Sequence, residues 1–167
     1  FMKPGKHAST DKRLKLTDME DTRFLHCNIK TLNLLVNVMA AEKAEEAGCG
    51  ECVFHRGDIV TECAHSNVSI IKDGMFKTHP ADHYIVPGIT RMHLIQICKD
   101  NGIPVDETPF TMQELMDADE VIVSSSTKFC APACEMNGTP IGGKAPELIS
   151  LLQEKYLEKF ENETKAE

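Results

Sequence analysis

Residues 51–79 read ECVFHRGDIVTECAHSNVSIIKDGMFKTH, and this stretch decides the fold class. It contains short runs rich in β-branched and aromatic residues, which are typical of strands. The runs are residues 51–55, 58–62, 67–72 and 75–79. The turn-forming sequences RGD (56–58) and KDG (72–74) separate them in pairs. The stretch therefore predicts a meander of hairpins.

The flanking sequence adds helices and further strands on both sides of this meander. Thr31 is a candidate N-cap for the first helix and Gly48 is its candidate end, while Gly88-Ile89-Thr90 opens the second helix. The predicted elements are a strand at 14–20, helices at 32–47 and 88–101, a strand at 104–110, a short helix at 112–118, strands at 120–125 and 129–136, a hairpin turn at 137–138 and a helix at 144–160. The fold class is therefore α+β, with a barrel-like, mostly antiparallel sheet and helices packed outside it.

Composition excludes several classes of protein. The chain has 167 residues, 41% of them hydrophobic, which suits one globular domain. The net charge is −8, and a negative field repels phosphate backbones and anionic lipids, so no nucleic-acid or membrane partner is expected. No apolar run approaches the roughly 20 residues of a membrane span. The N-terminal residues have no signal-peptide core, so a cytoplasmic location is expected.

The number of cysteines and their setting favour reduced thiols over disulfides. Their number is seven, and nothing marks the chain for secretion. Cys49 and Cys52 form a C-x-x-C pair, which together with Cys130 and Cys134 could make a four-thiolate zinc site. The two pairs lie far apart and the second spacing is loose, so buried apolar thiols are favoured and no metal is expected.

Two ionisable residues are candidates for chemistry. Lys30 lies at a predicted helix start, where partial desolvation would lower its proton affinity and suit Schiff-base formation. Taken alone, Lys30 is more often read as an ordinary surface lysine. Glu62 ends a strand before a small, polar stretch that would let a ligand approach closely, and the alternative is an ordinary hairpin.

Two other segments are candidates for binding a phosphate. The sequence PGITR (87–91) places free N–H groups at a helix N-terminus, although Thr90 could instead be a simple cap. The sequence SSST (124–127) follows an apolar strand, and its hydroxyls either bind a phosphate or form a turn.

Taken in order, these segments resemble one family. They are HCNIKTLNLL (26–35), VTECAHSNVSIIKDG (60–74), HYIVPGITR (83–91) and ETPFTMQELMDADEVIVSSST (107–127). The ordered set resembles the D-amino acid aminotransferases, which share the fold-type IV class of pyridoxal 5'-phosphate (PLP) enzymes with branched-chain aminotransferases and aminodeoxychorismate lyases. The resemblance covers about residues 14–160. Branched-chain enzymes usually have glycines soon after the lysine, where this chain has TLNLL (31–35).

The resemblance implies a PLP site. Lys30 would form the Schiff base with PLP and move the proton at the substrate Cα. Glu62 would accept a hydrogen bond from the protonated pyridine nitrogen, so that the ring acts as an electron sink. The other residues implied at the cofactor are Ile89, Thr90, Ser125 and Ser126 for the phosphate, Val86 near the ring, and Arg23.

The resemblance also implies an activity and a domain plan. The reaction would be transamination between a D-amino acid, such as D-alanine, and a 2-oxo acid, in a homodimer. The alternatives are branched-chain transamination, the lyase reaction, or an inactive isolated domain. Residues 1–13 are basic and polar with Pro4 and Gly5, so they are expected to be a linker or inter-domain arm, followed by the PLP-binding domain at 14–161 and a polar tail at 162–167. The N-terminal domain that precedes this one in the family would be absent from this chain.

The loop after Glu62 departs from the family pattern. Cys63 stands where a glycine usually follows the glutamate, and an adjusted turn is expected because cysteine lacks the conformational freedom of glycine. Ala64 and His65 replace serines that are common there, so His65 is expected to alter the hydrogen bonding or the phosphate environment of the cofactor.

Overall fold

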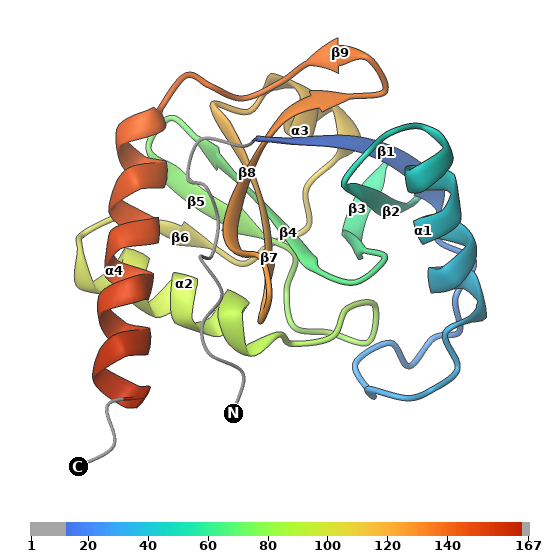
Figure 1. Cartoon of the computed structure of the whole chain (residues 1–167), viewed down its shortest axis with the longest axis horizontal. Coiled ribbons are helices and arrows are strands. Elements are labelled where there is room, and N and C mark those ends of the chain that lie inside the picture. The colour runs from blue at the N-terminus through green and yellow to red at the C-terminus, as the bar shows by residue number, and fades with distance from the viewer. Residues whose placement is uncertain (1–12, 165–167) are drawn as a thin grey trace.

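In the computed structural model, which describes residues 13–164, the predicted meander becomes part of a nine-stranded sheet (Figure 1). The strands are β1 (Leu14–Glu20), β2 (Glu51–Arg56), β3 (Ile59–Cys63), β4 (Asn67–Lys72), β5 (Met75–Thr78), β6 (Val105–Asp106), β7 (Glu120–Ser125), β8 (Phe129–Met136) and β9 (Thr139–Pro140). The helices are α1 (Leu35–Glu46), α2 (Ile89–Asp100), α3 (Met112–Asp117) and α4 (Pro146–Thr164). The predicted α+β class is confirmed.

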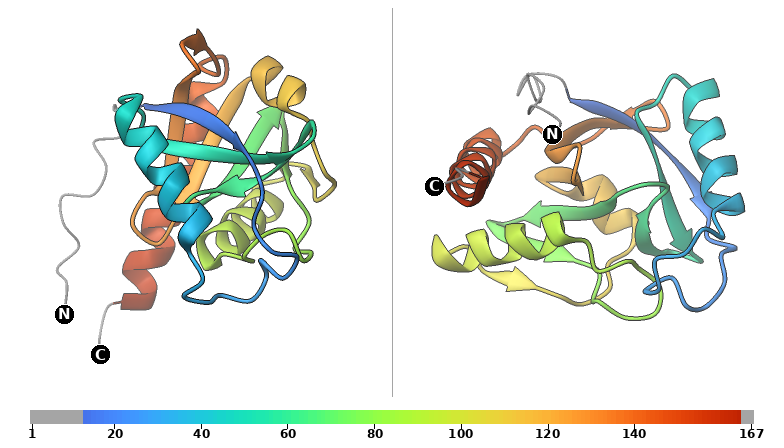
Figure 2. Two further views of the ribbon diagram at one scale, coloured as in Figure 1. Left: turned by 90° about the vertical axis from the view of Figure 1, so that its right-hand side faces the viewer. Right: turned by 60° about the horizontal axis from the view of Figure 1, so that its bottom comes forward.

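The sheet curls until its two edges approach each other (Figure 2). Its strand order among the described residues is β3-β2-β1-β8-β7-β4-β5-β6, with β9 paired to β8. Strand β1 runs parallel to β2 and β8, and β5 runs parallel to β6, while the other pairs are antiparallel. Edge strand β3 meets the segment after β6, because Val60 N donates to Phe110 O at 2.9 Å and Met112 N donates to Asp58 O at 2.8 Å. The barrel-like, mostly antiparallel sheet is therefore confirmed.

The two surfaces of this curled sheet bury separate cores. Apolar side chains from the inner surface pack with Phe110, just before α3, and with Leu115, in α3. Helices α2 and α4 cover the outer surface over β4, β7 and β8, where Leu94 and Leu152 are fully buried. Helix α1 packs on β2 through Ala40 and Ala44. Burying a large apolar side chain such as Leu94 or Leu152 stabilises the fold by about 1.5–3 kcal/mol.

Several predicted boundaries are wrong. The last helix, predicted at 144–160, is α4 at Pro146–Thr164, and two other differences have a clear physical reason. Helix α1 begins at Leu35 rather than at residue 32, and Thr31 does not cap it, because its Oγ1 accepts a hydrogen bond from Asn33 N at 3.2 Å in a local turn. Leu32 is 96% exposed, so no packing surface stabilises an earlier helical turn. The strand predicted at 104–110 shrinks to Val105–Asp106, because Asp106 Oδ1 accepts from Thr108 N and turns the chain.

The ends of the described chain join the body of the fold. Most of the predicted linker, residues 1–12, and residues 165–167 of the predicted tail lie outside the described residues. Arg13 forms an ion pair with the buried Glu120 at 2.6 Å, and α4 continues to Thr164. The division into linker, domain and tail stays a prediction. None of the helices described combines the length and the hydropathy of a membrane span.

Candidate cofactor site

Three segments that are distant in sequence lie together on the lower side of the domain in Figure 1. They are the β1–α1 loop, which carries Arg23 and Lys30, the start of α2, and the β7–β8 turn. Glu62, near the end of β3, joins the first two of these segments through hydrogen bonds. The fold thus brings the predicted lysine, carboxylate and phosphate segments to one side of the domain.

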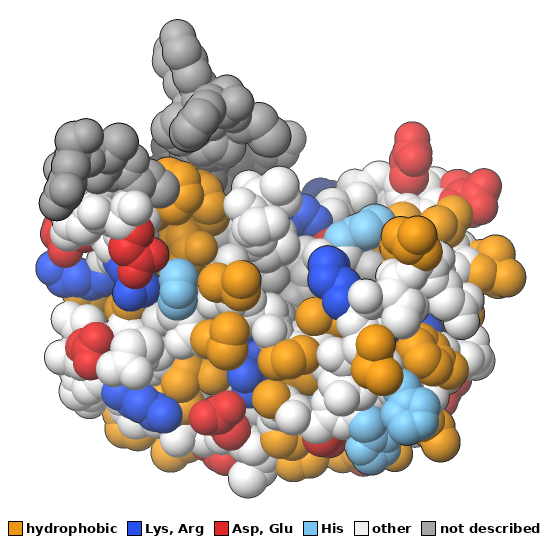
Figure 3. All heavy atoms as spheres, turned by 90° about the horizontal axis from the view of Figure 1, so that it is seen from below, with side chains coloured by type: hydrophobic (Ala, Val, Ile, Leu, Met, Phe, Trp, Pro, Cys, Tyr) orange, Lys and Arg blue, Asp and Glu red, His pale blue; other side chains and the backbone are white. Residues whose placement is uncertain are grey.

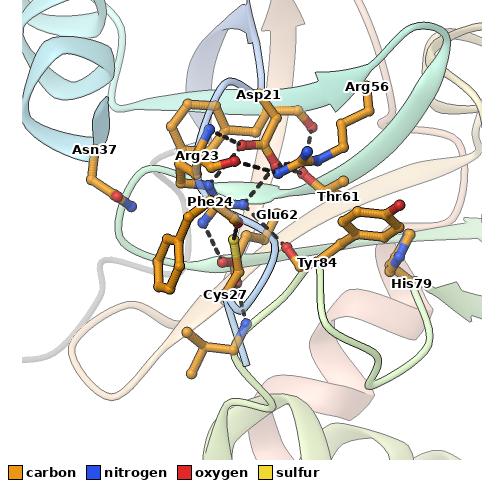
Figure 4. Close-up of polar contacts among 12 residues, drawn as sticks. Asp21, Arg23, Phe24, Cys27, Asn37, Arg56, Thr61, Glu62, His79 and Tyr84 are labelled. Carbon is orange, nitrogen blue, oxygen red and sulfur yellow. Dashed lines mark hydrogen bonds and ion pairs between the residues drawn. The ribbon is translucent and has the colours of Figure 1, made fainter. Parts of the chain in front are cut away.

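Glu62 is the buried acceptor of this site (Figure 4). Its Oε1 accepts from Arg23 Nη1 at 2.5 Å, and its Oε2 accepts from Asn67 Nδ2 and from Val86 N, both at 3.0 Å. Burial raises the pKa of Glu62 to about 7, although the Arg23 charge acts in the opposite direction. A cationic ring nitrogen beside this carboxylate would favour its ionised form.

Arg23 is fixed mainly by Asp21. Its Nε and Nη2 donate to the two oxygens of Asp21, each at 2.9 Å, and Nη2 also donates to Tyr84 O at 3.2 Å. The guanidinium carbon lies 4.5 Å from the ring centroid of Phe54. Burial alone would lower the pKa of Arg23, but the charges and hydrogen bonds of Asp21 and Glu62 outweigh it and raise the pKa. Arg23 therefore stays charged and orients Glu62.

Asp21 is a residue that the sequence reasoning missed. Its side chain is fully buried and also accepts from Thr61 Oγ1 at 3.0 Å and from Arg56 Nε at 3.3 Å. Burial raises the pKa of Asp21, but the contacts with Arg23 outweigh it, so the net shift is downward. An acid two residues before the candidate arginine was the available signal. Such a buried carboxylate is stable only with cationic partners.

The second missed residue is Asn67, at the start of β4. Its Nδ2 donates to Glu62 Oε2 and to Val86 O at 2.9 Å, so one amide connects the carboxylate with the segment that leads into α2. Its Oδ1 lies so close to Gly88 that a Cβ at that position would be 2.2 Å away. The backbone of Asn67 pairs with Ser124 of β7. A strand-initiating asparagine does not by itself predict this role, because the role depends on Val86, 19 residues away, lying beside the nearby Glu62.

The N-terminus of α2 has the free backbone N–H groups that a phosphate site at a helix end would need. Gly88 is the N-cap and has no side-chain capping bond, so Thr90 does not cap the helix as the alternative interpretation required. The first N–H groups of a helix lack partners within it and carry partial positive charge. Thr90 is buried, and its Oγ1 lies 3.3 Å from the hydroxyl of Tyr156 on α4. Ile89 is exposed at this terminus.

The β7–β8 turn presents the serines differently from one another. Ser125 Oγ accepts from Lys128 N at 3.1 Å and shapes the turn, whereas Ser126 is exposed. Phe129 closes the turn in the left-handed region, with φ of 51°. The buried hydroxyls of Ser69 and Ser124 have no hydrogen-bond partner within the described residues. Of the two serines, Ser126 is therefore the more exposed.

Lys30 is exposed in the β1–α1 loop and lies five residues before α1, so the expected helix start and partial desolvation at this residue are not found in the structure. The loop is docked by Cys27, whose N–H donates to His83 O at 2.8 Å and whose thiol donates to Phe24 O at 3.1 Å. Within residues 13–164, no hydrogen bond or ion pair involves the Lys30 amine. An amine on a loop anchored beside the Arg23–Glu62 pair suits a group that binds an aldehyde.

The loop after Glu62 accommodates the departures from the family pattern. Cys63 keeps ordinary strand geometry in β3, and its N–H donates to Ser66 O at 2.7 Å. Burial raises the pKa of the Cys63 thiol well above its ordinary value. The exposed His65 has its Nδ1 3.5 Å from Glu51 Oε1, and Ala64 N donates to Cys52 O. In this structure, therefore, His65 faces Glu51.

The thiols of the zinc alternative are not brought together in the part of the chain described. No group of three or more His, Cys, Asp or Glu side chains there could hold a metal ion. Cys52 is buried under α1, whereas Cys130 is buried under α2 and α4, so the four thiols are not gathered. All seven cysteines are free thiols.

The residues present fit PLP by the chemistry of their donors and acceptors. The start of α2 and the Thr90 hydroxyl offer donors to a phosphate. Glu62 offers a buried acceptor to a ring nitrogen, and Lys30 offers an amine to an aldehyde. The set includes no group that would exclude the cofactor on charge, because the charges of Glu62 and Asp21 are balanced by Arg23 and Arg56 within the described network.

Comparisons with known proteins agree with this fit. Residues 2–136 match the family described as amino-transferase class IV. The chain is 46% identical over 142 residues to D-alanine aminotransferase of Listeria monocytogenes, covering 84% of this chain and 49% of that protein. It is 47% identical over 144 residues to D-alanine aminotransferase of Staphylococcus haemolyticus, covering 84% and 51%. The chain thus spans about half the length of the curated relatives it matches.

Solved structures share the fold. A branched-chain amino acid aminotransferase from a T.th. strain, complexed with N-(5'-phosphopyridoxyl)-L-glutamate, superposes with a TM-score of 0.78 at 25% identity, over 87% of this chain and 50% of that one. A fold IV transaminase of Curtobacterium pusillum gives a TM-score of 0.78 at 21% identity, over 87% and 53%. The match over residues 2–136, with the relatives at 46–47% identity, shows that the chain belongs to the class IV aminotransferase family.

Proposed function

We propose that this chain is the cofactor-binding half of a PLP-dependent aminotransferase that moves an amino group between a D-amino acid, such as D-alanine, and a 2-oxo acid. The observation that carries the proposal is the buried Arg23–Glu62 pair, hydrogen-bonded to the segment that opens α2. The identity of 46% to D-alanine aminotransferases favours this substrate class over branched-chain substrates, whose enzyme is 25% identical.

Each residue has a role in this proposal. Bound PLP supplies an aldehyde for amines and a ring that withdraws electrons from the substrate Cα. Lys30 binds the aldehyde and then moves the proton at that carbon. Glu62 keeps the ring nitrogen protonated, and Arg23 keeps Glu62 in place. The phosphate is held by the N–H of Ile89 and by hydroxyls of Thr90 and Ser126, with Ser125 shaping the turn and Val86 lying near the ring.

The remaining half of the enzyme is needed to complete the site. Large apolar side chains are exposed along the β1–α1 loop, on α1 and at the start of α2, and hydrophobic side chains spread over the face in Figure 3. They are Phe24, Leu25, Ile29, Leu32, Leu34, Leu35, Val38, Met39, Ile89 and Met92. Apolar patches of this extent are usually covered by other polypeptide. This supports a preceding domain and a homodimer, which we propose for the full-length enzyme together with a cytoplasmic location.

The test is covalent labelling of Lys30. The full-length protein is mixed with PLP, its absorbance is recorded, and borohydride reduction followed by peptide mapping locates the bound cofactor. We expect the label on Lys30 and its loss in Lys30→Ala, while the control Lys155→Ala, on α4, keeps it. A label on another lysine, or no PLP absorbance, would overturn the proposal. The same labelling of residues 1–167 alone should show weak binding. An aminotransferase assay of these residues should show little turnover.

A substrate panel distinguishes the related activities. We expect faster turnover with D-alanine than with branched-chain L-amino acids, and no pyruvate release from aminodeoxychorismate. A preference for either of the latter substrates would keep the cofactor role of Lys30 and Glu62 but reassign the reaction.

A further inference from the structure

Tyr156 brings helix α4 to the N-terminus of α2, where the phosphate is proposed to bind. It lies 66 residues after Thr90, yet its hydroxyl is 3.3 Å from Thr90 Oγ1. Both side chains are buried, with exposed fractions of 6% for Tyr156 and 4% for Thr90. None of the phosphate-binding segments predicted from the sequence includes α4, so this contact adds an element to the site.

The ring of Tyr156 is held independently of its hydroxyl. Its centroid lies 5.1 Å from that of Phe129 and 6.0 Å from that of His93 on α2. Gln153, one turn earlier on α4, donates to Cys130 O at 2.9 Å and ties the helix to β8. A phenylalanine at position 156 would therefore keep the same packing, so the hydroxyl can be removed without displacing the ring.

Hydrogen-bond chemistry indicates which of the two hydroxyls is the donor. A threonine hydroxyl has one proton and two acceptor lone pairs, and a phenol is the more acidic of the two groups. When the Tyr156 hydroxyl donates to Thr90 Oγ1, the Thr90 proton is left for another acceptor. A phosphate at the N-terminus of α2 is such an acceptor, and hydrogen bonds in a chain strengthen one another.

We propose that Tyr156 is a positioning residue that directs the Thr90 hydroxyl proton toward the phosphate of the cofactor. This inference rests on the proposed function. Tyr156 acts through Thr90 and touches no reacting atom. Its loss should weaken the binding of the phosphate group and leave the contacts to the ring and the aldehyde unchanged.

The test compares two ligands that differ only in the phosphate. Dissociation constants of PLP and of pyridoxal are measured by absorbance for the full-length protein and its Tyr156→Phe, Thr90→Val and doubly substituted variants. A neutral hydrogen bond of typical strength predicts a PLP dissociation constant about 3–10 times higher in Tyr156→Phe, with an unchanged constant for pyridoxal. In the Thr90→Val background, Tyr156→Phe should have no further effect. Ser150→Ala, which removes an exposed hydroxyl from the same helix, is the control and should change neither constant.

Three results would overturn the inference. They are an unchanged PLP constant in Tyr156→Phe, an equal weakening of PLP and pyridoxal, and an undiminished effect of Tyr156→Phe when Thr90 is already valine. If the unsubstituted protein binds neither ligand, the proposed function itself fails, and that result is distinct because it appears before any substitution is made.

Discussion

Arg23 and Glu62, which lie 39 residues apart in the sequence, form a buried ion pair with 2.5 Å between Nη1 and Oε1. The pair links the β1–α1 loop to β3, and its arginine is held from the other side by Asp21 (Figure 4). The charges are removed from water, so their stability depends on each other and on the neighbouring hydrogen bonds. This relationship makes the site sensitive to changes in residues that would not touch the cofactor.

Asp21→Asn should destabilise the fold by about 3 kcal/mol, because it leaves the buried guanidinium of Arg23 with one counter-charge fewer. Urea denaturation at pH 7.5 measures the change in the free energy of unfolding. Glu135→Gln is the control, since its partner Lys15 is 55% exposed and water screens the charges of such a pair. A cost for Asp21→Asn as small as that of the control would contradict the dependence on Asp21.

The stability contributed by Glu62 in the cofactor-free protein should fall as the pH rises. Its pKa is raised to about 7 in the fold from an ordinary value of 4.5, so the folded state holds the proton over a range in which the unfolded state has lost it. The contribution is fully present below about pH 4.5 and is lost as the pH rises through about 7. The unfolding free energy of the unsubstituted protein, minus that of Glu62→Gln, should therefore decrease from pH 5 to pH 8. A difference that increases with pH would refute the upward shift.

Gly88→Ala should destabilise the protein by about 1–3 kcal/mol because of one contact. The backbone of Gly88, at φ −63° and ψ 138°, suits any residue, but a Cβ would lie 2.2 Å from Asn67 Oδ1. Asn67 would then have to shift and release Glu62 and Val86.

Asn67→Ala should relieve this clash, so Gly88→Ala should cost little more in that background. Thermal or urea unfolding of the four proteins gives the coupling. Gly50→Ala is the control, because its Cβ would meet only the flexible end of Leu14, at 2.9 Å. Equal costs of Gly88→Ala in both backgrounds would show that Asn67 is not the reason for the glycine.

Lys128→Met should destabilise the protein by about 2–4 kcal/mol at pH 8. The side chain of Glu51 is 1% exposed, and Lys128 Nζ is its ion-pair partner at 2.6 Å. Adding Glu51→Gln should recover part of the loss, because the buried charge disappears. Lys72→Met is the control, since Lys72 is 46% exposed and lies 3.5 Å from Asp119. A double variant less stable than Lys128→Met would contradict this account.

The sequence by itself determined the strand meander, the order of elements and the chemical identity of the candidate groups. Alternation and turn residues act locally, so β4, β7 and β8 have the predicted bounds, and the motifs around Lys30, Glu62 and Thr90 indicated the family. Helix α1 started later than its periodicity predicted, because exposed Leu32 finds no surface to pack on within the described chain.

Only the tertiary structure decided which side chains hold those groups in place. No role was assigned to Asp21, Asn67 or Tyr156 from the sequence. Tyr156 reaches Thr90 across 66 residues. Asp21 and Asn67 lie only two and five residues from Arg23 and Glu62, and their further bonds to Arg56 and Val86 cross the fold. The burial that raises the pKa of Glu62 is likewise a property of the closed sheet. Local sequence sets which conformations and functional groups are available, whereas distances between remote segments and their removal from water arise from packing the whole chain.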